Sequence, residues 1–175
     1  GALTYSRSLD GGATWDTPVH KIFADFDSSV TRGISADAYA IDVRGSVVAV
    51  VAGDGVQDLI LLKSTDNGVT WTKTTIFDFP LDKWNYETTL SDVNNDGVAD
   101  TIDTYDGNLA ILIDNNDQVN VFFGNNRIIQ DNPVAGGGYS YFPGTDGIFH
   151  WSESMGPNNP VIIAGAIDRD GDGVL

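Results

Sequence analysis

Two stretches of the sequence place oxygen-bearing residues at alternate positions around a glycine. The first runs from residue 91 to residue 100, and the second from residue 166 to residue 175. Counted from the first Asp, the ligand positions are 1, 3, 5, 7 and 9, of which position 7 contributes a backbone carbonyl. The predicted metal ligands are Asp92, Asn94, Asp96, Val98 and Asp100 in the first stretch, and Asp168, Asp170, Asp172 and Val174 in the second.

This spacing has a chemical reason. Alternate side chains in a tight loop converge on one centre, and Gly97 or Gly173 at position 6 permits the sharp bend. Several carboxylates this close would repel one another without a cation between them. Magnesium usually keeps several waters and needs fewer protein ligands, so a shell of protein oxygens favours calcium. We therefore predict calcium as the cofactor, in a structural role. The alternative is a pair of Asp/Asn-Gly turns without an ion.

A second motif occurs twice and predicts a particular kind of turn. Residues 8–15 and 64–71 share the pattern Ser-x-Asp-x-Gly-x-Thr-Trp, and their tryptophans are 56 positions apart (71 minus 15). Within such a turn, Asp accepts hydrogen bonds from backbone amides and Gly supplies a positive φ. The Ser and Thr hydroxyls tie the strand ends together, and Trp folds back to bury its ring. The motif therefore predicts a hairpin turn held by side chains.

The apolar pattern around these motifs predicts short strands. Val, Ile and Leu cluster in brief runs separated by Asp, Asn and Gly, and no segment has helical periodicity. After residue 124 the chain becomes irregular, which indicates an insertion. The expected strands are 38–43, 46–52, 58–63, 70–79, 101–104, 109–113, 119–123, 147–151 and 161–167, with turns at 106–108 and 114–117.

These motifs carry a family resemblance. Residues 8–15 and 64–71 resemble the Asp-box, or BNR repeat, of sialidases and many other β-propellers. The acidic stretches resemble the calcium loops of FG-GAP/VCBS-type propeller repeats and of other secreted bacterial modules. The resemblance implies an all-β fold, a β-propeller of four-stranded antiparallel blades. In that family the Asp-box lies on the outer turn between the third and fourth strands of a blade, so it indicates architecture and not activity.

The length then sets the expected organisation. At roughly 50 residues a blade, 175 residues hold about three blades, whereas a complete propeller needs at least four. We expect a single partial propeller domain belonging to a longer protein. Its expected parts are the end of a blade (1–30), two blades (31–80 and 81–130), and an insertion followed by the start of a further blade (131–175).

Composition excludes several classes of partner. The formal net charge is −16, and the acidic residues comprise 23 Asp and only 2 Glu. Without clustered Lys and Arg, nucleic-acid binding is excluded, and no apolar run is long enough for direct membrane insertion. The chain has no Cys, so disulfides are excluded. Acidity as an adaptation to high salt is a further hypothesis. It is disfavoured because Asp is concentrated in turn motifs.

Catalytic residues are not predicted. A sialidase would need three clustered Arg and a Tyr-Glu pair, and Arg32, Arg44 and Arg127 lack the family's Arg-Ile-Pro context. Tyr86 and Glu87 are adjacent, which on a strand would point them to opposite faces. The two histidines, His20 and His150, are isolated in strand-like contexts. Four aromatic residues near the insertion could form a binding platform or pack in the core: Tyr139, Tyr141, Phe142 and Trp151.

The sequence therefore favours a non-catalytic, calcium-stabilised β-propeller segment of a secreted or cell-surface protein. Adhesion, recognition or assembly is the expected role, with a protein or glycan as partner. The alternative is a propeller glycoside hydrolase whose catalytic residues lie partly outside this chain.

Overall fold

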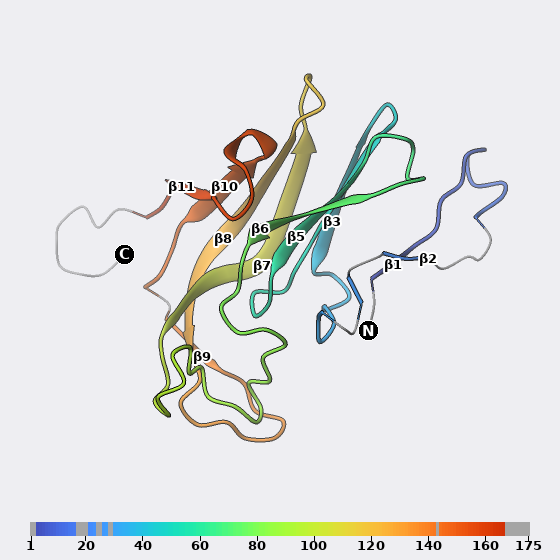
Figure 1. Ribbon diagram of the computed structural model, residues 1–175. Helices are drawn as coiled ribbons and strands as arrows, with labels where there is room; N and C mark the ends of the chain where they lie inside the picture. Colours follow the sequence, from blue (N-terminus) through green and yellow to red (C-terminus); the bar gives the residue numbers. More distant parts are fainter. Residues whose placement is uncertain (1–2, 17–20, 24–25, 28–29, 143, 167–175) are drawn as a thin grey trace.

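The computed structural model describes all residues except 1–2, 17–20, 24–25, 28–29, 143 and 167–175 (Figure 1). In this part of the chain the regular structure is β-strand, apart from one turn of 3₁₀ helix, η1 (Glu153–Met155). The prediction of an all-β fold is confirmed. Among the same residues there is no helix of the length and apolar character that crossing a membrane requires.

The first large sheet is a four-stranded antiparallel meander. Its strands are β3 (Tyr39–Arg44), β4 (Val47–Ala52), β5 (Leu59–Ser64) and β6 (Thr72–Phe77), and they lie in sequence order. The four strands expected between residues 38 and 79 are thereby confirmed. The continuous apolar runs of β4 and β5 are buried on both faces, as such runs predict.

The second large sheet repeats this meander over a longer stretch. It consists of β7 (Ile102–Ile113), β8 (Val119–Ile129), β10 (Ile148–Ser152) and β11 (Val161–Ala164), again antiparallel and in sequence order. A fifth, two-residue strand, β9 (Ser140–Tyr141), pairs with the far end of β8. The segment boundary expected at residue 130 therefore falls inside one sheet, because the pairing of β8 with β10 bridges the insertion.

One expected turn is wrong. Residues 106–108 were predicted to separate two strands, but β7 runs through them with a shift of register after Tyr105. The Asp106 carboxylate accepts hydrogen bonds from the backbone amides of Asn108 (2.9 Å) and Gly124 (3.1 Å). Because Gly124 belongs to the neighbouring strand β8, Asp106 holds the irregular stretch within the sheet instead of reversing the chain.

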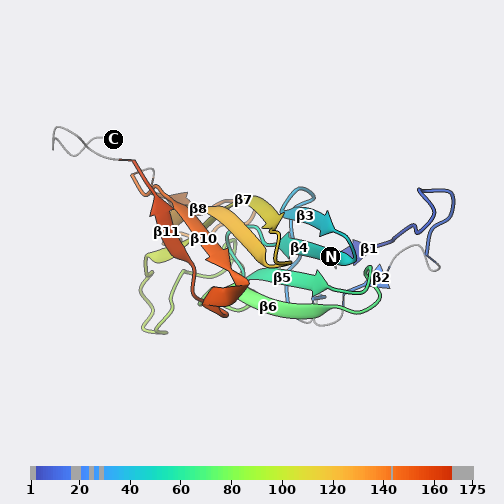
Figure 2. The ribbon, with the colours of Figure 1, turned by 90° about the horizontal axis from the view of Figure 1, so that it is seen from above.

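A short hairpin adds a third layer. Strands β1 (Thr4–Tyr5) and β2 (Lys21–Ile22) pair antiparallel and lie against the β3–β6 sheet on the side away from β7–β11 (Figures 1 and 2). Two cores result. The core between the large sheets includes Leu61, Tyr105 and Trp151. The core beneath the hairpin includes Phe23, Val50, Ile60 and Leu62.

The two ends of the stacked sheets differ. The β3–β4, β5–β6 and β7–β8 turns lie at one end, and the long connections 78–101 and 130–147 lie at the other (Figure 1). Basic side chains tie the sheets together at the turn end. Arg44 donates to the carbonyl of Asp114 (2.7 Å), and Lys63 pairs with Glu153 (2.7 Å).

Candidate functional site

The residues 64–71 form the turn between β5 and β6, the third and fourth strands of their sheet. We call this stretch, and residues 8–15, the Asp-box turns. The Asp66 carboxylate accepts from the Ser64 hydroxyl (2.7 Å) and from the backbone amide of Thr70 (2.9 Å) and its hydroxyl (2.7 Å). Gly68 has a φ of +76°, and its amide donates to the Ser64 hydroxyl (2.8 Å). These contacts hold the turn as its chemistry predicts.

The residues 8–15 repeat the same hydrogen bonds. Ser8 donates to Asp10 (2.7 Å), and both the amide (2.8 Å) and the hydroxyl (2.6 Å) of Thr14 donate to Asp10. The hydrogen bonds from Thr14 lower the pKa of the Asp10 carboxyl from its ordinary value of 3.8 to about 2. The pKa of Asp66 is lowered by the same contacts from Thr70. The repeated sequence therefore folds into a repeated local structure.

The first Asp-box hairpin contacts the second. Arg7 donates to the carbonyl of Asn67 (2.6 Å), inside the second turn. Trp71 packs edge-on against Tyr5 and Phe23, with ring centroids at 5.3 and 4.8 Å. Trp15, the equivalent residue of the first turn, is 56 % exposed. The expected burial of the motif tryptophan thus holds in part for Trp71, which is partly buried, and is wrong for Trp15, which has no neighbouring hairpin within the described residues.

The turn after β10 shares the spacing of the Asp-box turns but not all of their contacts, since the Gly156 amide donates to the carbonyl of Glu153 (3.2 Å) and not to the Ser152 hydroxyl. Ser152 ends β10 as Ser64 ends β5, and its hydroxyl lies 2.9 Å from that of Ser154. Gly156 follows with a φ of +78°. Ser152, Ser154 and Gly156 thus have the spacing of Ser64, Asp66 and Gly68. The 2-residue intervals were visible in the sequence, but Ser in place of Asp and the absence of Trp hid the match.

The residues 91–100, which we call the acidic loop, are anchored at their base. The backbone of Ser91 pairs with that of Gln130 (3.1 Å), and the Ser91 hydroxyl donates to the carbonyl of Asp100 (2.6 Å). Gln130 directly follows β8, and its side chain donates to the carbonyl of Tyr86 (2.6 Å). Both Ser91 and Gln130 are buried. The base of the acidic loop is therefore fixed to the second sheet.

The oxygen atoms of the acidic loop turn toward the loop's own backbone. Gly97 has a φ of +86°, the bend that its position predicts. The side-chain oxygens of the predicted ligands accept amide hydrogen bonds of 2.8 to 3.1 Å. The amides of Gly97 and Asp96 donate to the Asp92 side chain, and the Asp96 amide also donates to that of Asn94. The Val98 amide donates to the Asp96 side chain, and the Val93 amide donates to that of Asp100.

The donor set of the acidic loop suits a hard cation. It combines three carboxylates, one amide oxygen and a carbonyl, and no ion pair to Lys or Arg is formed by its carboxylates within the described residues. The carboxylates are not gathered at one point: no group of three or more such side chains fit to hold a metal is present in the described part. The other predicted ligands, Asp168, Asp170, Asp172 and Val174, lie outside the described residues.

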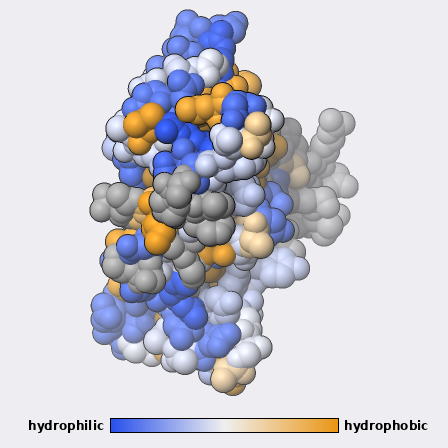
Figure 3. Space-filling model, turned by 90° about the vertical axis from the view of Figure 1, so that its right-hand side faces the viewer, coloured by the Kyte–Doolittle hydropathy of each residue, from blue (hydrophilic) through white to orange (hydrophobic). Residues whose placement is uncertain are grey.

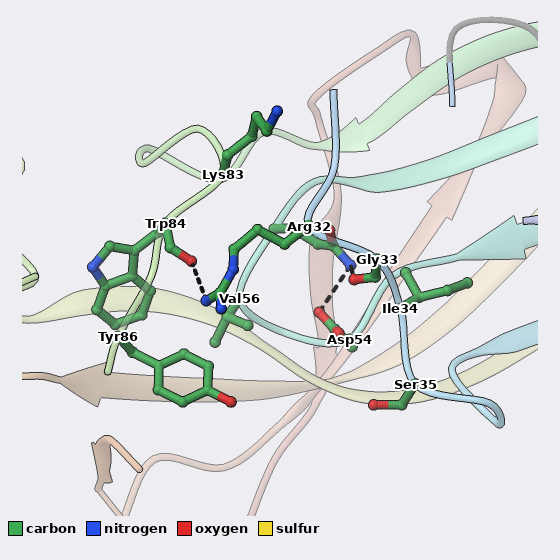
Figure 4. Close-up of a pocket in the computed structure, with 10 residues that line it drawn as sticks. Arg32, Gly33, Ile34, Ser35, Asp54, Val56, Lys83, Trp84 and Tyr86 are labelled. Atoms are coloured by element: carbon green, nitrogen blue, oxygen red, sulfur yellow. Dashed lines mark hydrogen bonds between the residues drawn. The ribbon is translucent and has the colours of Figure 1, made fainter. Parts of the chain in front are cut away.

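A pocket of about 310 Å³ opens at the end of the sheets away from the Asp-box turns. We call it the Arg32 pocket. It is formed by the segment before β3, the β4–β5 connection and the segment after β6 (Figure 4). Its polar lining comprises Arg32, Ser35, Asp54, Gln57 and Lys83, beside Tyr86 and the buried Trp84. Because these segments are far apart in sequence, no short sequence motif predicts the pocket.

Arg32 is held in place without an opposite charge. Its guanidinium donates to the carbonyl of Trp84 (2.9 Å) and lies 5.7 Å from the centroid of the Tyr86 ring. In contrast, Arg7, Arg44 and Arg127 each pair with an Asp. Within the described part of the chain, no carboxylate pairs with Arg32. Its partners are therefore a carbonyl and an aromatic face.

Asp54 is the acidic group of the same pocket. Burial raises the pKa of its carboxyl, although amides of Val56 and Ser35 and the side chain of Gln57 (3.0 Å) donate to it. Asp54 and Arg32 line one space but form no ion pair with each other (Figure 4). The pocket thus offers a cationic donor and a carboxylate acceptor that remain separate.

The residues considered for sialidase chemistry do not gather. Arg44 contacts the β7–β8 turn, and Arg127 pairs with Asp103 across β7 and β8, so only Arg32 lines the pocket. Tyr86 and Glu87 lie in a turn. The prediction that they point to opposite faces of a strand is therefore wrong.

Of the two histidines, only His150 lies within the described residues. His150 lies on β10 and stacks on Phe122 at 4.9 Å, while its Nε2 lies 3.0 Å from Oδ1 of Asn120. It therefore packs on the outer face of the second sheet. His20 lies outside the described residues.

The four aromatic residues near the insertion do not form one platform. Trp151 is buried in the core between the large sheets and donates to the carbonyl of Gly156 (2.7 Å). Tyr139 packs on Tyr86 at 5.2 Å. Tyr141 and Phe142 are exposed. Of these residues only Tyr139 supports the wall of the Arg32 pocket.

Comparison of the chain with models of protein families, with curated proteins and with solved structures finds no match.

Proposed function

We propose that the chain is a calcium-stabilised β-propeller segment that serves recognition or assembly in a secreted or cell-surface protein. The observation that carries this proposal is the stacking of two four-stranded antiparallel meanders, with an Asp-box turn between the third and fourth strands of the first. Four-stranded antiparallel sheets are the repeating unit of β-propellers, so this stacking supports the interpretation of the two sheets as adjacent blades. The β1–β2 hairpin corresponds to the last two strands of a preceding blade, because its Asp-box turn has the same internal contacts.

The apolar surfaces at both sides of the stack support the blade interpretation. On the hairpin side, Tyr39, Ile41 and Val43 of β3 are exposed, with Ile41 and Val43 each 57 % accessible. Figure 3 views the molecule from this side and shows apolar side chains gathered among polar ones. On the opposite side, Val161 and Ile163 of β11 are exposed. Such faces are typical of sheets that pack against further sheets.

The acidic loop supports calcium as the cofactor. It lies in the long connection that joins the two large sheets, and its base is fixed by buried Ser91 and Gln130. A cation there would draw together the carboxylates of Asp92, Asp96 and Asp100, which carry like charges in one short loop. Calcium loops of low affinity are suited to the millimolar calcium outside cells, which is consistent with a secreted or cell-surface protein.

Calorimetric titration of calcium into the chain tests this assignment. The wild type should bind calcium, and Asp92→Asn combined with Asp96→Asn should remove the site formed by the acidic loop. Asp131→Asn is the matched control, because Asp131 is an exposed carboxylate outside the loop. A double variant that binds as many calcium ions as the wild type would overturn the assignment of the acidic loop.

A further inference from the structure

The Arg32 pocket is the strongest unassigned feature of the molecule. We propose that it binds one neutral, hydroxyl-rich ring, such as a terminal sugar residue of a glycan. This inference rests on the proposed recognition function and names its ligand class. The juxtaposition that carries it is a guanidinium and a carboxylate that line the same pocket without pairing with each other.

The first step concerns the charge of the ligand. Arg32 and Asp54 contribute opposite charges to the pocket, and Lys83, which has an interaction of its own, adds a further positive charge to its lining. An anionic ligand at Arg32 would be repelled by Asp54, and a cationic ligand at Asp54 would be repelled by Arg32. A neutral ligand meets neither penalty. A ligand that contacts both Arg32 and Asp54 is therefore favoured when it is uncharged, even though the whole chain carries −16.

The second step concerns hydrogen bonding. A sugar hydroxyl both donates and accepts, so neighbouring hydroxyls can accept from a guanidinium and donate to a carboxylate. Arg32 keeps donors beyond the one that it gives to Trp84. The hydroxyl groups of Ser35 and Tyr86, which can both donate and accept, also belong to the pocket lining (Figure 4). This set suits the hydroxyl groups of a pyranose ring, each of which can both donate and accept.

The third step concerns size and rigidity. A volume of about 310 Å³ lies at the lower end of small-molecule pockets, which suits a single ring. The wall is braced from behind: Tyr86 packs on Trp84 at 5.9 Å, and its carbonyl accepts from Gln130 (2.6 Å). Since Gln130 also holds the base of the acidic loop, the pocket is preorganised by the same residue that anchors that loop.

Saturation-transfer NMR with the full chain tests this proposal. The probes are the methyl glycosides of glucose, galactose and mannose, with glycine as a zwitterion and acetate as an anion. At least one glycoside should receive saturation from the wild type. Arg32→Gln and Asp54→Asn should each weaken its binding about tenfold or more, because each removes a charge-assisted hydrogen bond. Arg127→Gln should leave the affinity unchanged, because Arg127 lies outside the pocket.

Three results would overturn the proposal. The first is that no glycoside receives saturation from the protein. The second is that glycine or acetate binds more strongly than any glycoside. The third is that Arg127→Gln weakens glycoside binding as much as Arg32→Gln does. Loss of sugar binding with retained calcium binding would refute only the pocket assignment. Sugar binding without calcium binding would refute the calcium assignment and leave the pocket standing.

Discussion

Gly53 and Tyr105 offer a direct test of how β7 packs on the β4–β5 connection. Tyr105 is fully buried, and its hydroxyl donates to the carbonyl of Gln57 (3.0 Å). A Cβ on residue 53 would overlap that hydroxyl and would lie 3.1 Å from Cδ1 of Leu59. Gly53→Ala should therefore destabilise the fold by about 2 kcal/mol through overpacking. Tyr105→Phe should cost about 1 kcal/mol through loss of the hydrogen bond.

The double variant distinguishes this packing from two independent effects. Removing the hydroxyl makes room for the added methyl group, so Gly53→Ala with Tyr105→Phe should cost only about 1 to 2 kcal/mol, compared with about 3 kcal/mol for independent sites. Urea unfolding followed by tryptophan fluorescence measures these free energies. Gly138→Ala is the control, since no atom lies within 4 Å of its added Cβ. Strict additivity of the two substitutions would refute the contact.

Further predictions concern ion pairs, titration and the loop anchor. Lys63→Gln should lower stability by about 1 to 3 kcal/mol because it leaves the half-buried Glu153 unpaired, whereas Arg127→Gln, at an exposed pair, should cost less than about 1 kcal/mol in the same urea titrations. Because the pKa of Asp10 is lowered to about 2, its stabilisation should be present above about pH 4 and be lost as the pH falls toward 2. In Asp10→Asn the melting temperature should therefore depend less on pH over that range than in the wild type. The same pH dependence of the melting temperature in both proteins would contradict this. Because burial raises the pKa of Asp54, ionisation of this carboxyl opposes folding. Asp54→Asn should therefore raise the melting temperature near pH 7 but not below about pH 4. A melting temperature lower than that of the wild type near pH 7 would refute this. Gln130→Leu should cost about 2 kcal/mol or more in urea unfolding, since it leaves the carbonyls of Tyr86 and Gly138 without their donor; a stability equal to the wild type would argue against this anchor.

The parts of the fold that local sequence determines were predicted well. The runs of Val and Leu in β4 and β5 fix strands that are buried on both faces, whatever lies beyond them. The Asp-box turns likewise depend on contacts within eight residues, so Asp10 and Asp66 make the hydrogen bonds that their spacing predicts. The all-β class follows from these two features.

Features that depend on distant residues were missed. The continuity of β7 depends on the hydrogen bond that the backbone amide of Gly124, on another strand, donates to the Asp106 carboxylate. The partial burial of Trp71 and the exposure of Trp15 depend on whether a second hairpin lies beside the motif. The Arg32 pocket joins three segments that only the sheet stacking brings together. Sequence spacing contains none of these contacts.

The dependence of thermal stability on calcium tests the central claim most directly. The melting temperature of the chain is measured in excess calcium and in EDTA. It is measured again after excess calcium, or excess magnesium as the control ion, is added to the EDTA-treated chain. If calcium stabilises the acidic loop, the melting temperature should fall in EDTA and recover with calcium but not with magnesium. The same melting temperature in calcium and in EDTA would contradict the account.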